Sequence, residues 1–183
     1  MIWCPLNDDR LLMTHSQRLR RVGILCCHCL RNLAFYLSWY EVGKPFISSQ
    51  FWVNTNSNFL DITVLEWCKL FGDERGKQYF ARVVSEPAQF RKKLFAELAV
   101  TEAAFNDCIQ QMRTYRDKFV AHLDELDTMQ IPDLSIAKKS TIFLYEYLLA
   151  QEAEADTFHD APKSAKRFFD DFLAQGKAAY NNK

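Results

Sequence analysis

Residues 101–126 constrain the fold of this 183-residue chain more than any other stretch. Apolar or weakly polar side chains recur there every three or four residues, at Phe105, Cys108, Met112, Tyr115, Phe119 and His122. This spacing places them on one face of a helix that packs against neighbouring elements. Thr101 stands where it can cap the helix, and Glu102 lies in the first turn, where a negative charge suits the helix dipole. The pattern predicts a helix over 101–124.

Prolines and glycines divide the rest of the chain into similar segments. The five prolines fall between periodic runs or at their starts, and three of the five glycines mark the same gaps. Proline removes a helix hydrogen-bond donor and restricts the residue before it. No stretch alternates apolar and polar residues for long enough to predict a sheet. We therefore expect an all-α fold, an antiparallel helical bundle with additional short helices.

The other helices are expected over 9–41, 46–71, 85–98 and 134–152, with an interruption at the polar run 54–58 and a short helical turn within 78–84. Asp133 is the expected cap of the helix at 134. Residues 1–183 are read as one domain, with a core of about 10–152 and a C-terminal helix of about 161–180 that Asp160 and Pro162 open. Aromatic-rich faces on the first and last helices favour a homodimer.

Composition excludes several classes of protein. Lys plus Arg and Asp plus Glu both number 23, so binding of an anionic partner requires a local basic patch. The longest nearly apolar run, 22–30, is far shorter than the roughly 20 residues of a membrane helix, and the N-terminus does not resemble a secretion signal. Six cysteines are too few for a disulfide framework. These features predict a cytoplasmic protein that does not enter a membrane.

The run Cys26-Cys27-His28-Cys29 has two interpretations. Two cysteines separated by two residues form half of a structural zinc site, which needs four ligands. Cys26 and Cys29 also fall on the apolar seam of the first predicted helix, formed by Leu19, Val22, Cys26, Cys29, Leu33, Tyr36 and Tyr40, and buried free cysteine packs as a small hydrophobe. Core packing is favoured, so no metal or cofactor is expected. His15 and His159 are isolated and expected at the surface.

Arg116 and His122 form the pair with the clearest chemistry. Histidine exchanges protons near neutral pH and can serve as general acid or base. Arginine stays charged and presents donors that match phosphate oxygens. Together they suffice to cleave RNA without a metal, one handling the 2′-hydroxyl or the leaving oxygen and the other stabilising the phosphorane.

A structural role for the same two residues is the alternative. His122 then packs in the core, satisfied by Asp124 or a carbonyl, and Arg116 pairs with Asp117 at the surface. Geometry also limits the catalytic reading, because six residues along an ideal helix leave two side chains about 120° apart. Either the helix ends or bends near His122, or two subunits combine their pairs.

The text Tyr115-Arg116-Asp117-Lys118-Phe119-Val120-Ala121-His122-Leu123-Asp124 resembles the R-x(4–6)-H motif of HEPN domains. These are all-helical modules found in RNA-cleaving toxins, CRISPR nucleases and abortive-infection proteins. Asp117, Ala121 and Asp124 match a branch in which R-(D/N)-K-x-x-A-H-x-D closes a long helix.

The resemblance implies a metal-independent endoribonuclease of toxin–antitoxin or phage-defence type, with an antitoxin protein as a further partner. Its composite active site forms where two such helices of a homodimer meet. In this chain His122 would be the acid or base, Arg116 would hold the phosphate, Asp117 and Asp124 would orient them, and Tyr115 and Lys118 would contact RNA. A non-catalytic helical module that binds a nucleotide, RNA or a protein is the second hypothesis, and a zinc-stabilised regulator is the third.

Overall fold

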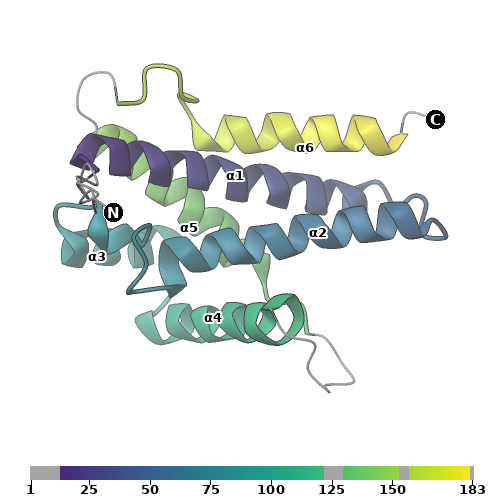
Figure 1. The fold of residues 1–183 in the computed structure, drawn as a ribbon, viewed down its shortest axis with the longest axis horizontal. Helices are drawn as coiled ribbons and strands as arrows, with labels where there is room; N and C mark the ends of the chain where they lie inside the picture. Colours follow the sequence, from purple (N-terminus) through teal and green to yellow (C-terminus); the bar gives the residue numbers. More distant parts are fainter. Residues whose placement is uncertain (1–12, 122–129, 153–156, 182–183) are drawn as a thin grey trace, which may run out of the picture.

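The computed structural model describes residues 13–121, 130–152 and 157–181, and every regular element in these ranges is helical (Figure 1). The predicted all-α fold is confirmed. The α-helices within the described ranges are α1 (His15–Glu41), α2 (Gln50–Trp67), α3 (Pro87–Leu98), α4 (Glu102–Tyr115), α5 (Leu134–Tyr147) and α6 (Ala165–Asn181). The π-helical segments Cys68–Gly72, Arg116–Ala121 and Leu148–Glu152 continue α2, α4 and α5, and Phe80–Arg82 forms a 3-10 turn. None of the described helices combines the length and apolar character needed to cross a membrane.

Helix α1 lies at the centre of the bundle, between α2 and α6, and α5 packs against it from behind (Figure 1). The chain runs through α2 in the opposite direction to α1, whereas α6 runs in the same direction as α1. Helix α4 lies along the other side of α2, and α3 packs on α5. The π-helical segment after α4 contacts α2, and α4 contacts the segment after α2. Helix α4 and its π-helical continuation, residues 102–121, are called the motif helix below. This arrangement brings the end of the motif helix to the end of α2.

The predicted apolar seam of α1 is buried from Leu19 to Tyr36, whereas Tyr40 is exposed. Cys26 and Cys29 belong to the core, which confirms their packing role. Trp67 is fully buried, and its indole Nε1 donates to Ser140 Oγ at 2.9 Å. Among the described residues, no group of three or more His, Cys, Asp or Glu side chains has an arrangement that would hold a metal ion.

Two predicted helix caps are confirmed. The Thr101 hydroxyl accepts a hydrogen bond from the Ala104 backbone N–H at 3.2 Å. The Asp133 carboxylate accepts one from the Ser135 backbone N–H at 2.8 Å. Each side chain satisfies a donor that the first turn of a helix leaves without a partner.

The predicted course of α2 was wrong in two respects. Its helix is continuous through 54–58, because the hydroxyls of Thr55 and Ser57 donate to backbone carbonyls one turn earlier and so do not interrupt the helix. It begins at Gln50 rather than near 46, because Lys44 and Phe46 have φ angles of 56° and 61°. These positive values place both residues outside the right-handed helical region.

Three other boundaries also differ. Helix α3 begins at Pro87 and is flanked by Glu86, since the Ser85 side chain bonds Glu152 instead. Within 78–84 only Phe80–Arg82 is helical. Helix α6 begins at Ala165, because the Asp160 carboxylate pairs with Arg20 of α1 and does not cap a helix.

The aromatic faces of α1 and α6 cover each other within one chain. The Phe35 and Phe172 ring centroids lie 5.6 Å apart, and those of Trp39 and Tyr180 lie 5.2 Å apart. Both pairs meet edge to face, an arrangement that aromatic rings favour. These faces therefore no longer argue for a homodimer.

Gly176 allows this close approach, and its replacement by alanine is expected to destabilise the fold by about 2 kcal/mol. A Cβ atom there would lie 2.2 Å from Ser38 Oγ and 2.8 Å from Ser38 Cβ. Urea unfolding measures the loss, and Gln175→Ala at the exposed neighbouring position is the control. In a Ser38→Gly background, Gly176→Ala should lower the free energy of unfolding by much less. An unchanged cost in that background would show that Ser38 is not the obstacle.

Candidate functional site

Arg116 stands at the junction between α4 and the π-helical segment Arg116–Ala121. Its Nε donates to Asp117 Oδ1 and its Nη1 donates to Asp73 Oδ1, both at 2.7 Å. Asp73 directly follows the π-helical segment Cys68–Gly72 that continues α2. The two carboxylates hold the guanidinium in one orientation with its side chain 20% exposed. They also raise the pKa of Arg116, Asp117 most strongly, so the group stays charged.

A second arginine fixes the same junction. Arg113, one turn before Arg116, donates from Nη2 to the backbone carbonyl of Gly72. Consecutive turns of the motif helix thus bind the carbonyl of Gly72 and the carboxylate of Asp73. The end of α4 is therefore held to the end of α2 by two side chains that carry charge.

The π-helical segment changes the geometry expected for the motif. Its hydrogen bonds join residues five apart, so the 120° separation calculated for an ideal α-helix does not apply beyond Arg116. Such π-helical turns are frequent at functional sites. The helix thus departs from α geometry within the motif, and the predicted end or bend near His122 stays a prediction. His122 and Asp124 lie outside the described residues.

Tyr115 connects the motif helix to α2. Its hydroxyl donates to Asp61 Oδ1 at 2.8 Å, and its side chain is 2% exposed. Burial raises the pKa values of both groups. The Tyr115 hydroxyl therefore donates its proton within the chain. The predicted contact between Tyr115 and RNA stays a prediction, and it would involve the aromatic ring and not the hydroxyl donor. Lys118 is half-buried on the π-helical segment, and Asp117 is exposed.

A cavity of about 490 Å³ adjoins the motif helix. Aromatic rings and side-chain amides share its lining, which comprises Gln110, Gln111, Thr114, Tyr115, Phe119, Gln130, Ile131 and Pro132. Aromatic rings stack on nucleobases, and glutamine amides can donate to and accept from base edges. The described wall of this cavity therefore suits a polar heterocycle.

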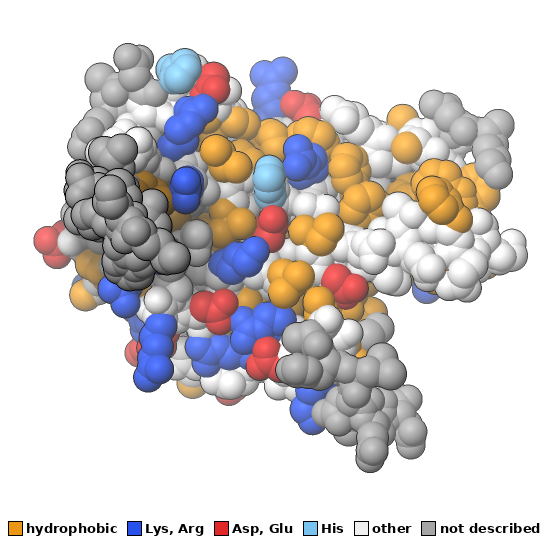
Figure 2. Space-filling model, viewed as in Figure 1, with side chains coloured by type: hydrophobic (Ala, Val, Ile, Leu, Met, Phe, Trp, Pro, Cys, Tyr) orange, Lys and Arg blue, Asp and Glu red, His pale blue; other side chains and the backbone are white. Residues whose placement is uncertain are grey.

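Charged residues of both signs are mixed over α4 and the neighbouring end of α2 (Figure 2). The structure adds Asp73 and Asp61 to the residues that the sequence indicated, since both bind side chains of the motif helix. The sequence contained one indirect signal for Asp73, its place just after the helix predicted over 46–71. No signal in the sequence connected Asp61 with Tyr115.

No protein-family model matches the chain, and no curated protein or solved structure matches it either. The resemblance to HEPN domains therefore rests on the motif residues and on the all-helical fold.

Proposed function

We propose that this protein is a metal-independent endoribonuclease of HEPN type that acts as a homodimer in toxin–antitoxin or phage-defence biology, with an antitoxin protein as a further partner. The observation that carries the proposal is the fixed guanidinium of Arg116, six residues before His122. A guanidinium has five N–H donors, more than the two carboxylate contacts of Arg116 use, so it can also bind a phosphate oxygen.

Each residue has a defined role in the proposed reaction. His122 takes the proton of the 2′-hydroxyl, whose oxygen forms a bond to phosphorus as the bond to the 5′-oxygen breaks. A protonated group, the partner subunit's copy of the histidine in a composite site, returns a proton to that leaving oxygen. Arg116 stabilises the negative charge that develops on the phosphorane. Asp117 and Asp73 orient Arg116, and the products carry 2′,3′-cyclic phosphate and 5′-hydroxyl ends.

Cleavage of a cellular RNA pool in EDTA tests the proposal. The natural protein should cut RNA, whereas Arg116→Ala and His122→Ala should not, although both variants should keep the dimer and the circular dichroism of the natural chain. Analysis of the fragment ends should show cyclic phosphates. Cutting by the His122→Ala variant at the natural rate would contradict the assignment.

A non-catalytic binding module is the second candidate, and one observation favours it. Arg116, Arg113 and Tyr115 all make contacts within the chain, which tie the motif helix to α2 and the turn after it. Under this alternative no protein cuts RNA, and Arg116→Ala lowers the unfolding temperature or the affinity for a ligand. The natural protein and its Arg116→Ala and His122→Ala variants thus distinguish a ribonuclease from a non-catalytic binding module.

A further inference from the structure

A second cavity, of about 330 Å³, lies against α1 and is lined by none of the motif residues. Its walls come from residues between 20 and 31 of α1, from Tyr145 of α5, from residues 158 and 160–162 and from Phe168 of α6. The volume is at the lower end of the range for small-molecule sites, so it suits a single ring system and not a dinucleotide.

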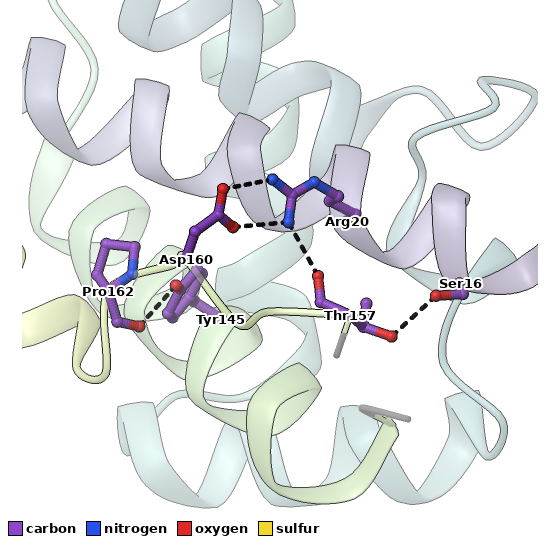
Figure 3. Close-up of polar contacts among 6 residues, drawn as sticks. All are labelled: Ser16, Arg20, Tyr145, Thr157, Asp160 and Pro162. Atoms are coloured by element: carbon purple, nitrogen blue, oxygen red, sulfur yellow. Dashed lines mark hydrogen bonds and ion pairs between the residues drawn. The ribbon is translucent and has the colours of Figure 1, made fainter. Parts of the chain in front are cut away.

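The segment that leads into α6 is fastened to α1 (Figure 3), and its residues 158 and 160–162 line one wall of this cavity. Arg20 donates to Asp160 Oδ1 and Oδ2 at 2.7 and 2.8 Å and to the Thr157 carbonyl at 3.2 Å. The hydroxyls of Ser16 and Thr157 lie 2.8 Å apart. Tyr145 donates its hydroxyl proton to the Pro162 carbonyl at 2.8 Å. These contacts from two helices preform the wall.

Gly23 allows the aromatic ring of Phe158 to pack directly against α1. A Cβ atom at Gly23 would lie 2.4 Å from Phe158 Cε1, so only glycine accommodates the ring at this distance. Phe158 then forms an apolar wall together with Ile24, Pro162 and Phe168.

Two arginines line the cavity, and they differ in their partners. Arg20 is neutralised by its two bonds to Asp160. Arg31 has its guanidinium carbon 5.7 Å from the centroid of the Phe172 ring and makes no ion pair within residues 13–121, 130–152 and 157–181. His28 Nδ1 lies 3.6 Å from Glu66 Oε1. An apolar cavity with a guanidinium beside it is complementary to an anion that carries an apolar group.

We propose that this cavity binds a small carboxylate or phosphate monoester with an aromatic or branched apolar group, and that Arg31 binds its anionic end. The apolar group would lie between Phe158, Phe168 and Ile24. The Cys27 thiol in the lining has a pKa raised to about 11, chiefly by burial, so it stays protonated and the binding is reversible.

Protein-observed NMR titration of the full chain tests this proposal with phenylacetate, phenyl phosphate and neutral phenylacetamide as probes. Millimolar concentrations of either anion should shift the amide signals of Gly23 and Ala161, and the amide probe should bind at least tenfold more weakly. The relative affinities of phenylacetate and phenyl phosphate identify which anionic group the site prefers.

Substitutions of one arginine locate the anion. Arg31→Met should weaken binding of both anions at least tenfold, and Arg31→Lys should keep part of the affinity. Arg167→Met is the control, because Arg167 lies on α6 with its side chain 85% exposed and does not line the cavity. Equal binding of phenylacetamide, unchanged affinity in Arg31→Met, or no shift with any probe would overturn the proposal.

Discussion

Replacing Arg116 by lysine is expected to lower RNA cleavage about 10²–10³-fold, the loss typical when one preorganised donor to a developing charge is removed. Lysine keeps the positive charge but lacks the planar arrangement of donors. The natural side chain uses Nε for Asp117 and Nη1 for Asp73, which fixes the direction of the remaining donors. A single ammonium group cannot bond both carboxylates in this way and still face a phosphate.

Initial cleavage rates of a defined single-stranded RNA in EDTA measure this effect. Arg75→Lys is the matched control, because Arg75 is exposed in the turn that follows Asp73, and it should retain the natural rate. Asp73→Asn should reduce the rate less than Arg116→Lys does, since Asp117 still orients the guanidinium. Equal activity of Arg116→Lys and the natural protein would show that charge alone is needed and that the two carboxylate contacts have no catalytic role.

Local signals in the sequence predicted the helices well. Thr101 and Asp133 cap helices through contacts with residues two or three positions away, and such contacts follow from neighbouring residue types. The seams of α1 and α4 follow from the helical period, which burial confirms at Cys26, Cys29 and Met112. These features depend on the segment itself and need no knowledge of its neighbours.

The errors arose where distant contacts decide the structure. Asp160 was expected to open the last helix, but it pairs with Arg20, which is 140 residues away in the sequence. The partner of Arg116 across the site, Asp73, is separated from it by 43 residues. No periodicity identifies such partners, because an isolated carboxylate in a turn has the same local pattern whether or not it is paired.

Glu66 is a further residue whose surroundings in the fold the local sequence did not predict. It lies within the helix predicted over 46–71, where a carboxylate is expected to face water. In the structure the residue is 9% exposed, and its Oε2 atom has no hydrogen-bond partner among the described residues. A buried carboxylate with an unsatisfied oxygen costs free energy whenever it is charged.

Burial accordingly raises the pKa of Glu66 from its ordinary value of 4.5 to about 7, although Lys69 and Arg31 act in the opposite direction. Burial and Arg31 lower the pKa of His28, whose Nδ1 lies 3.6 Å from Glu66 Oε1. Both shifts favour the uncharged forms. The contact between the two side chains therefore gains little as an ion pair near neutral pH.

The consequence is a pH dependence of stability with a definite sign. Between pH 4.5 and about 7 the folded chain holds a proton on Glu66 that the unfolded chain has lost, so this group makes the fold less stable as pH rises. The lowered pKa of His28 has the opposite effect, since it adds stability as pH rises through the range below 6.5. Replacing Glu66 by glutamine removes the contribution of Glu66 to this pH dependence and leaves that of His28.

Glu66→Gln is therefore expected to unfold with a free energy about 3 kcal/mol higher than the natural protein at pH 8, the equivalent of a pKa raised from 4.5 to about 7. At pH 5 the two proteins should differ little, because the natural carboxyl is then protonated in the folded state. Urea unfolding at pH 5, 6, 7 and 8 measures the difference, with Glu97→Gln on the exposed face of α3 as the control. A difference that stays constant over this range would mean that Glu66 reaches water in the folded protein and is not forced to hold its proton.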